Sequence, residues 1–429
     1  MTVSRDDGSG GGRRSLCLYT RSADPSGMGA HLLELARGLA GRMDVTVLCR
    51  TGERVRWLFE AASACGARAV ALPGPHDPAY PEVLGAYLAS HPVDVFHCHA
   101  GWGWEDPHGL RLAAAAGVPA VVITHHLSYL LRHPGKAQRL IRNTSWAHWR
   151  IAVSDTLRES YLARGVSPER FVTVPNGIGR RRHPPGRAAA RAALRLPAQA
   201  PVVLSTGRLT AVKDQRSLVG AAALLAPERP DLQVVVLGEG EQRAELEGLV
   251  AALGLGGVVH LPGHRAHARA LLDAADVFVL PSRAEGMPLT VLEAMEAGLP
   301  VVATRGTGSA EAVVHGRTGL LVPPGDPGEL AAALGALLDD DAVRARYGAA
   351  GHRRYLERFT VGAMLAGTLA VYDAALGVRG PAARPRDPLD LGGRAGSSAV
   401  PGLSRRSAVP AEGDVSARSA APVRRVNRG

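Results

Sequence analysis

The chain has 429 residues, of which 50 are Lys or Arg and 39 are Asp or Glu, so its formal net charge is +11. An apolar content of 46% and a charged content of 21% are typical of globular domains and exclude a chain that is disordered throughout. The length is sufficient for two domains, each with its own hydrophobic core. No apolar run approaches the ~18 residues of a membrane-spanning helix, and residues 1–14 lack the apolar segment of a signal peptide.

The cysteines and the basic residues exclude further classes of protein. Cys17, Cys49, Cys65 and Cys98 show no C-x-x-C spacing, so we expect neither a disulfide framework nor a zinc ribbon, and we predict a cytoplasmic location. From Arg379 to the C-terminus there are 10 arginines and 4 acidic residues, so more than half of the net charge lies in the tail. With 4% aromatic content and no zinc-finger spacing, the sequence predicts no nucleic-acid partner.

Short apolar runs alternate with Ala-, Leu- and Arg-rich helical patterns along most of the chain, which predicts parallel sheets covered on both faces. The first group of predicted strands covers residues 16–20, 45–49, 68–72, 93–98, 120–124, 149–153 and 171–174. The second group covers residues 202–205, 233–237, 258–261, 277–280, 301–303 and 320–322. The predicted fold class is therefore α/β, with two doubly wound Rossmann-like domains and a ligand site in the crevice that faces their carboxyl strand ends.

Changes in composition predict the domain boundaries. Residues 1–14 are expected to be disordered, 15–180 to form the N-terminal domain and 181–200, rich in Pro and Arg, to form a linker. Residues 201–358 are expected to form the C-terminal domain, and the pattern is helical from 342 to 376. The Pro-, Gly-, Ser- and Arg-rich stretch 377–429 predicts a disordered basic tail.

The most informative segment follows the predicted strand 277–280. Glu285 lies in the loop after this strand, Pro288 suits the start of the next helix, and Glu293 lies eight residues after Glu285. Backbone N–H groups at that helix start can bind an anionic group such as a diphosphate. Two carboxylates at this spacing can hold hydroxyls at two points of a polyol. On spacing alone, the alternative of one helix-start glutamate and one solvated glutamate stays open.

Two cations follow the strand 202–205. Arg208 and Lys213 stand five residues apart in a loop, and Lys213 is one of only two lysines, with Lys136, among 50 basic residues. A guanidinium fork and a compact ammonium together suit a leaving diphosphate. Taken alone, the segment is equally compatible with two cations on the surface.

Other motifs carry weaker signals. The glycines at Gly27 and Gly29 and at Gly238 and Gly240 do not complete a dinucleotide fingerprint. His97, His99, His125 and His126 follow two strands, where hydrogen bonding to a polar ligand or a structural role is expected. We predict no metal site, because further ligands at a recognisable spacing are lacking. The acidic run at 339–341 predicts a solvated helix end.

Taken together in this order, the segments resemble glycosyltransferase family 4, the retaining enzymes of GT-B fold. The resemblance covers about residues 16–372. The motifs that carry it are the glycine loop 26–29, Asp94 with His97 and His99, residues 118–126, Val153 with Ser154, residues 174–178, the segment from Gly207 to Asp214, Gly238 to Gly240, Glu285 to Glu293, and Glu311 to Gly316 with the run from Thr318.

The resemblance implies roles for these residues. Arg208 and Lys213 would hold the diphosphate of a nucleotide sugar, with backbone N–H groups at Gly29 on the other side of the crevice. Glu285 would hold sugar hydroxyls, Glu293 the ribose hydroxyls, and His126 would face the donor sugar near the reacting centre. The remaining donor-binding positions that the resemblance implies are Gly238, Met287, Pro288 and Leu289. It implies no cofactor and no metal, front-face transfer with retention, and a final helix, residues 359–376, that returns to the first domain.

The acceptor is predicted from the first domain. The glycine loop with Arg132, Lys136, Arg139, Arg142 and Asn143 is similar to that of inositol-phosphate N-acetylglucosaminyltransferases of mycothiol synthesis and of transferases acting on 2-deoxystreptamine in antibiotic biosynthesis. We therefore expect a cyclitol acceptor and UDP-GlcNAc or UDP-glucose as donor. Three alternatives stay open: a lipid or cell-envelope acceptor with weak membrane-surface contact, a GT-B UDP-GlcNAc 2-epimerase, and a silent sugar-nucleotide binding protein. The oligomeric state is not predicted.

Overall fold

The computed structural model describes residues 13–22, 26–74, 77–101, 108–127 and 134–377. Within them, the first sheet has seven parallel strands in the order β3-β2-β1-β4-β5-β6-β7. Their bounds are β1 Ser15–Thr20, β2 Asp44–Arg50, β3 Arg68–Leu72, β4 Val95–Ala100, β5 Ala120–His125, β6 Trp149–Ala152 and β7 Phe171–Thr173. All seven strands coincide with predicted runs, which confirms the first half of the α/β prediction.

The second sheet has six parallel strands in the order β10-β9-β8-β11-β12-β13. Their bounds are β8 Val202–Thr206, β9 Gln233–Leu237, β10 Val259–Gly263, β11 Val277–Leu280, β12 Val301–Thr304 and β13 Gly319–Val322. Two doubly wound parallel sheets are thus present, as the sequence predicts. We call the part built on β1–β7 the N-terminal lobe and the part built on β8–β13 the C-terminal lobe.

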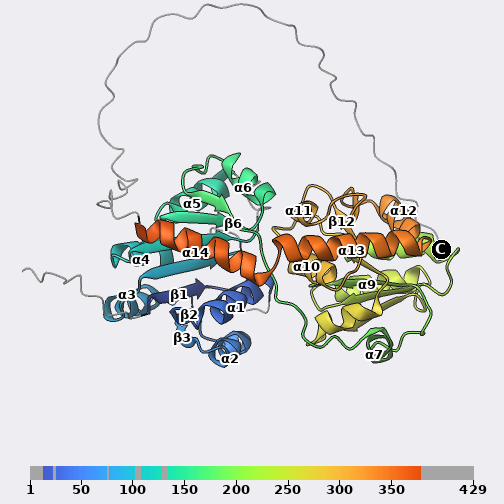
Figure 1. Ribbon diagram of the computed structural model, residues 1–429, viewed down its shortest axis with the longest axis horizontal. Coiled ribbons are helices and arrows are strands. Elements are labelled where there is room, and N and C mark those ends of the chain that lie inside the picture. Colours follow the sequence, from blue (N-terminus) through green and yellow to red (C-terminus); the bar gives the residue numbers. More distant parts are fainter. Residues whose placement is uncertain (1–12, 23–25, 75–76, 102–107, 128–133, 378–429) are drawn as a thin grey trace, which may run out of the picture. The chain divides into compact units, whose positions relative to one another are not determined.

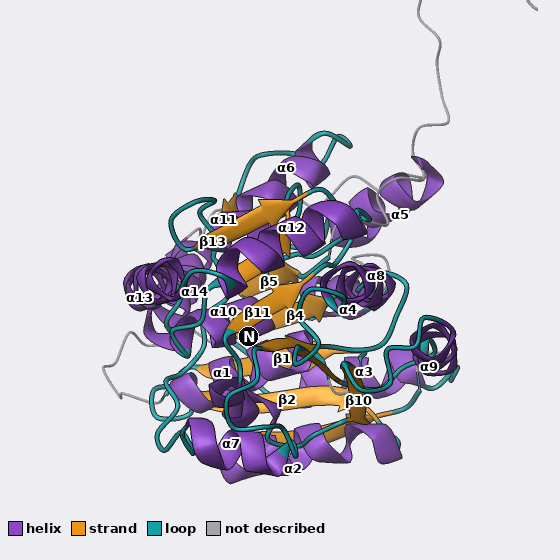
Figure 2. Cartoon of the chain, turned by 90° about the vertical axis from the view of Figure 1, so that its right-hand side faces the viewer, coloured by secondary structure: helices purple, strands orange, loops and turns teal. Residues whose placement is uncertain are grey.

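Helices cover both faces of each sheet (Figure 2). Those of the N-terminal lobe are α1 Gly27–Leu39, α2 Arg56–Ala64, α3 Tyr80–Ser90, α4 Gly109–Ala115, α5 Pro134–Thr144 and α6 Asp155–Leu162. Those of the C-terminal lobe are α7 Arg187–Ala193, α8 Gln215–Leu225, α9 Arg243–Ala252, α10 Leu289–Glu296, α11 Ser309–Ala312, α12 Pro327–Leu338 and α13 Asp341–Arg358. The 3-10 helices η1 Glu53–Val55 and η3 Ala268–Ala274 complete the two lobes, and α14 spans Val361–Gly377.

The strands are continuously apolar because both faces of the sheet are buried, and each face packs against a different hydrophobic cluster. In β1, Leu16 and Leu18 belong to one apolar cluster, whereas Cys17 and Tyr19 belong to a second cluster on the opposite face. Successive side chains of a strand point to opposite faces, so only a strand covered on both sides has this uninterrupted pattern. This is the physical reason that the sequence pattern located the strands.

The segment predicted as a linker contains a packed helix. Helix α7 lies within residues 181–200, and its Arg191 is buried, with one guanidinium nitrogen 3.1 Å from the Asp276 carboxylate. The same guanidinium donates to the carbonyls of Ala274, Pro197 and Ala198. The Pro- and Arg-rich composition predicted a linker, but here an arginine of this segment is satisfied by buried acceptors.

The predicted helical stretch 342–376 is interrupted at Phe359 and Thr360, where α13 ends and α14 begins. At this point the chain lies beside an earlier segment, because Ile178 N–H donates to the Phe359 carbonyl and Val361 N–H donates to the Ile178 carbonyl. Helix α14 then packs on the N-terminal lobe through Met364, Val371 and Tyr372 (Figure 1).

The predicted disordered ends fall outside the described residues, except for residues 13, 14 and 377, and Arg132 also lies outside them. Among the described helices, none is both long enough and apolar enough to cross a membrane.

A buried hydrogen bond joins α14 to the first sheet and predicts a stability effect. The Tyr372 hydroxyl lies 2.6 Å from Nδ1 of His97, whose Nε2 lies 2.7 Å from the Thr124 hydroxyl. We expect Tyr372→Phe to lower the free energy of unfolding by about 1–3 kcal/mol, because one buried imidazole nitrogen loses its partner. Urea denaturation measures this change. The control is Tyr347→Phe on α13, and an equal effect of both variants would contradict the prediction.

Candidate active site

Lys213 and Glu285 meet at the carboxyl edge of the second sheet. The Lys213 ammonium lies 2.6 Å from a Glu285 carboxylate oxygen, and the Glu285 side chain is only 6% exposed. The loops that carry them are joined directly, because Arg283 N–H donates to the Val212 carbonyl at 2.8 Å. Arg283 also pairs with Asp214, which has a left-handed backbone. The sequence thus selected two residues that the fold brings together from adjacent strands.

Arg208 occupies the same edge but is exposed, and within the described residues its guanidinium makes no hydrogen bond. Its backbone is fixed, since Gln215 donates to the Arg208 carbonyl at 2.8 Å. Gly238 supports this turn from the end of β9. A Cβ on Gly238 would stand 1.8 Å from the Gly207 carbonyl oxygen, so only glycine permits the approach. Arg208 is therefore available to an anion, and Gly238 shapes the turn that carries it.

Glu293 lies on α10 with a carboxylate that makes no hydrogen bond within the described residues. Burial raises the pKa of Glu293 to about 7, with the neighbouring Glu296 contributing and Arg269 and Arg181 opposing. Glu296, which the sequence analysis did not single out, accepts from Arg181 at 2.7 Å and pairs with Arg269 at 3.2 Å. These arginines and the Arg181 backbone N–H hold the pKa of Glu296 below its ordinary value against the effect of burial. Glu296 is therefore a structural anchor, and Glu293 is the carboxyl that remains available.

The start of α10 contacts the N-terminal lobe. Pro288 is the residue before the first turn, and the Met287 carbonyl accepts from the Asn176 amide at 2.7 Å. The Leu289 side chain lies 3.9 Å from the position that a Cβ on Gly27 would take. A Cβ on Gly286 would stand 2.0 Å from the His126 carbonyl oxygen, so glycine is required at this contact between the lobes. Met287, Pro288 and Leu289 therefore lie where the two lobes meet.

Glu311 makes a second contact between the lobes, to which the sequence analysis gave no role. Its carboxylate accepts the backbone N–H groups of Asp155 at 2.8 Å and Thr156 at 2.5 Å. These N–H groups belong to the first turn of α6, which leaves such donors without helical partners. A carboxylate from the C-terminal lobe thus caps a helix of the N-terminal lobe.

The sequence analysis gave no role to the hydroxyls of Thr290 and Ser309. Thr290 lies in the first turn of α10 and Ser309 begins α11, and within the described part of the chain both hydroxyl oxygens are buried without a hydrogen-bond partner. Helix starts commonly bind anions, so a hydroxyl at such a position after a β-strand is the signal that could have found them.

Gly29 has a packing role in the structure. Its N–H donates to the Ser26 hydroxyl at 3.3 Å, and a Cβ at this position would stand 2.5 Å from the Trp57 ring. The amide thus already has a partner at the start of α1. Diphosphate binding by the backbone at Gly29 stays a prediction.

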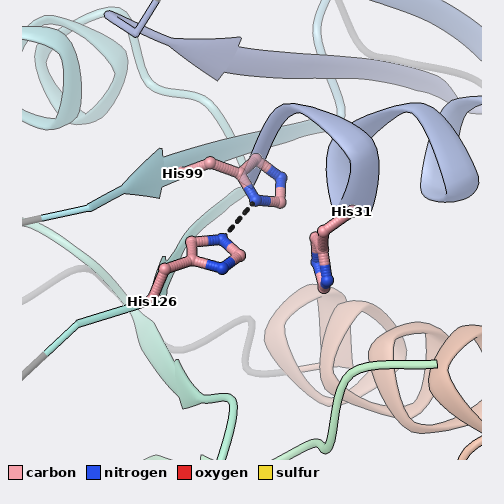
Figure 3. Close-up of side chains that lie close together, drawn as sticks. All are labelled: His31, His99 and His126. Carbon is pink, nitrogen blue, oxygen red and sulfur yellow. Dashed lines mark hydrogen bonds between the residues drawn. The ribbon is translucent and has the colours of Figure 1, made fainter. Parts of the chain in front are cut away.

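His126 lies directly after β5 and forms part of a buried group of imidazoles. Its Nε2 lies 3.3 Å from Nδ1 of His99, and the ring centroids of His126 and His31 are 4.8 Å apart (Figure 3). Burial, with the neighbouring imidazoles contributing, lowers the pKa of His126 and of His99 well below the ordinary value, so both rings are neutral near pH 7. His125 instead packs between Tyr161 and Phe171 in the core.

The acidic run has the structural role that was predicted for it. Asp339 pairs with Arg229, Asp340 caps α13 by accepting from Val343 N–H, and Asp341 pairs with Arg344.

Comparison with known proteins identifies the family. Residues 25–182 match the model described as Glycosyltransferase Family 4, and residues 186–354 match the model described as Glycosyl transferases group 1. A D-inositol 3-phosphate glycosyltransferase of Kineococcus radiotolerans is 34% identical over 86% of this chain and 94% of its own length. This chain belongs to glycosyltransferase family 4. It is a glycosyltransferase, and the two matched segments together include strands of both sheets.

Further relatives agree with this assignment. The D-inositol 3-phosphate glycosyltransferase of Streptomyces scabiei is 33% identical over 83% of this chain and 88% of its own. Among solved structures, HepE of Anabaena in complex with UDP-glucose has a TM-score of 0.73 at 22% identity, covering 84% of this chain and 99% of its own. Sucrose-phosphate synthase of Thermosynechococcus elongatus has a TM-score of 0.67 at 25% identity, covering 85% and 100%. The fold is GT-B.

The raised pKa of Glu293 predicts a pH-dependent cost to stability. In the folded chain the Glu293 carboxyl has a pKa above the ordinary value of 4.5. The stability that Glu293 contributes therefore falls as pH rises from about 4.5 to about 7. We expect Glu293→Gln to stabilise the free chain by about 1–3 kcal/mol at pH 8, with the gain vanishing towards pH 4.5. Thermal unfolding across this range measures the difference. Exposed Glu60→Gln is the control, and a pH-independent gain in Glu293→Gln would contradict the assignment.

Proposed function

We propose that the chain transfers a hexose or N-acetylhexosamine from a nucleotide diphosphate sugar to a hydroxyl of a cyclitol or cyclitol phosphate, with retention at the anomeric carbon. The observation that carries this proposal is the ion pair of half-buried Lys213 and buried Glu285 at the edge where the lobes meet. Arg208, on the same loop as Lys213, has no hydrogen-bond partner for its guanidinium among the described residues. The Lys213 ammonium, which can bind a phosphate, lies 2.6 Å from the Glu285 carboxylate, which can accept hydrogen bonds from sugar hydroxyls.

In this proposal, Lys213 and Arg208 neutralise the diphosphate and stabilise the charge that develops on it as the sugar departs. Glu285 accepts from sugar hydroxyls, and Glu293 accepts from ribose hydroxyls in its ionised form. The loop from Met287 to Leu289 presents backbone N–H groups at a helix start, and Gly238 shapes the turn beneath Arg208. HepE, which shares the fold, has been solved with UDP and with UDP-glucose, which supports a uridine nucleotide as the donor.

The proposed reaction follows from these charges. The bond from the anomeric carbon to the phosphate oxygen breaks while the acceptor oxygen attacks from the same face. The departing phosphate oxygen takes the proton of the acceptor hydroxyl. Two protein cations supply the charge stabilisation of the leaving group, so no divalent metal or cofactor is required for this step. His126, neutral and next to the Gly286 loop, would contact the donor sugar.

The acceptor proposal is supported by relatives named D-inositol 3-phosphate glycosyltransferase that align over most of this chain. An inositol phosphate, with UDP-GlcNAc as donor, is the substrate pair that we favour, which would place the chain in thiol biosynthesis. A 2-deoxystreptamine acceptor, in antibiotic biosynthesis, is the second candidate. On α5, the side chains of Lys136, Arg139 and Arg142 are exposed, which supports an anionic acceptor or surface near the N-terminal lobe.

One experiment tests the reaction class. The purified chain is screened with UDP-GlcNAc, UDP-glucose and other sugar nucleotides by thermal shift, and the best donor is then offered with inositol 3-phosphate or 2-deoxystreptamine. We expect a glycosylated cyclitol whose anomeric configuration, measured by NMR, matches that of the donor.

Other outcomes would overturn the proposal in distinct ways. Isomerisation of the sugar with donor alone would indicate an epimerase, and donor binding without transfer to any acceptor would indicate a silent binding protein. Transfer only to lipid in anionic vesicles, with co-sedimentation of the protein, would indicate a membrane acceptor. An inverted product would contradict the front-face mechanism.

Substitutions at the buried pair test the site. We expect Lys213→Ala and Glu285→Ala each to reduce turnover by at least ~10²-fold, because each removes a group that stabilises the transition state. The control is Arg216→Ala, since Arg216 forms an exposed ion pair with Glu245 at the start of α8. Steady-state kinetics measures the effect, and wild-type rates in both variants at the pair would refute the assignment.

A further inference from the structure

Three histidines from distant parts of the sequence converge at the carboxyl edge of the first sheet. His31 comes from α1, His99 from the end of β4, and His126 follows β5 (Figure 3). One ring nitrogen from each residue lies within 4.8 Å of the others, and all three side chains are buried. No metal site was predicted from the sequence, because the three histidines come from separate segments and show no recognisable ligand spacing along the chain.

The hydrogen bonds of His31 determine which of its nitrogens is available. The Asn176 amide nitrogen donates to the Met287 carbonyl at 2.7 Å, so the amide oxygen of Asn176 faces His31 Nδ1 at 2.8 Å. Because that oxygen can only accept, Nδ1 of His31 carries the proton and Nε2 presents a lone pair. Nε2 is buried and has no partner in the structure, although the side chain is only 3% exposed.

The distance between the other two rings is compatible with a shared metal ion. Nδ1 of His99 and Nε2 of His126 are 3.3 Å apart. Two imidazole nitrogens bound tetrahedrally to zinc at 2.0–2.1 Å are separated by about 3.3 Å. Nε2 of His99 is also buried and has no partner among the described residues, so a hydrogen bond between the two rings does not satisfy the cluster. Nearby His97 cannot join, because both of its nitrogens already have partners in Tyr372 and Thr124.

We propose that His31, His99 and His126 bind one divalent transition-metal ion of the zinc class. Three imidazoles without carboxylate suit Zn²⁺ and Co²⁺, whereas Mg²⁺ and Ca²⁺ require oxygen ligands. Asn176 orients His31 in the way that outer hydrogen bonds orient metal-binding histidines. Three protein ligands leave a fourth position for water or an anionic oxygen. The site is separate from the leaving-group chemistry, which Arg208 and Lys213 supply, and it shares only His126 with the proposed active site.

Metal binding is measured directly, without an activity assay. Tag-free, chelator-treated protein is titrated with Co²⁺ and then with Zn²⁺. We expect one Co²⁺ per chain with the visible absorption of a low-coordinate imidazole site, and its stoichiometric displacement by Zn²⁺ in calorimetry. The absence of this absorption, or only weak binding of several ions per chain, would overturn the proposal.

Variants then locate the ion. We expect His31→Gln and His99→Gln each to weaken Zn²⁺ binding by at least about 100-fold, and Asn176→Ala to weaken it by about 10–100-fold through the orientation of His31. His91→Gln, on the surface of the N-terminal lobe, is the matched control and should bind as wild type does. Unchanged affinity in the His31 and His99 variants would refute the site.

A spectroscopic measurement on the wild-type chain covers the case in which a variant fails to fold. X-ray absorption of the Zn²⁺-loaded protein should show three imidazole nitrogens at about 2.0–2.1 Å. A coordination shell made up of oxygens would show that the histidines form a hydrogen-bonded cluster only.

Discussion

The candidate active site depends on one ion pair, formed by the Lys213 ammonium and the Glu285 carboxylate. Both charges are largely withdrawn from solvent, so each stabilises the other and neither loop can move away without exposing or stranding a charge. An anion that enters this edge competes with Glu285 for the ammonium, and a polyol competes with Lys213 for the carboxylate. In the proposed function, each partner of the pair would exchange the other for a ligand group.

The pair exists because β8 and β11 are neighbours in the sheet. The strand order reverses between them, since β9 continues on one side of β8 and β11 lies on the other. Loops after such strands diverge and leave room for a ligand at the carboxyl edge. The first sheet has the same reversal between β1 and β4, and the histidine cluster gathers there. In each lobe, a cluster of polar side chains thus lies where the strand order reverses. The cluster is the Lys213–Glu285 pair in the C-terminal lobe and the three histidines in the N-terminal lobe.

Among the described residues, several buried polar atoms without hydrogen-bond partners lie near these two points. Thr290 and Ser309 in the C-terminal lobe and His31 and His99 in the N-terminal lobe all bury such atoms. An unsatisfied buried group reduces stability, so its retention at a ligand edge is understandable when a ligand supplies the partner. The raised pKa of Glu293 follows the same logic, because a carboxyl that is withdrawn from water without an ion pair of its own is costly to ionise.

The strands could be predicted from the sequence, because a strand buried on both faces has a continuous apolar run that local composition reveals. The sequence also indicated Lys213 and Glu285, since each lies in the loop that follows such a strand. The folded structure was needed to show that Arg191 is buried against Asp276, and that His31 lies close to His99 and His126. These contacts depend on which strands become neighbours and on where a helix crosses them. Spacing along the chain cannot encode that choice, because it results from packing between segments far apart in sequence.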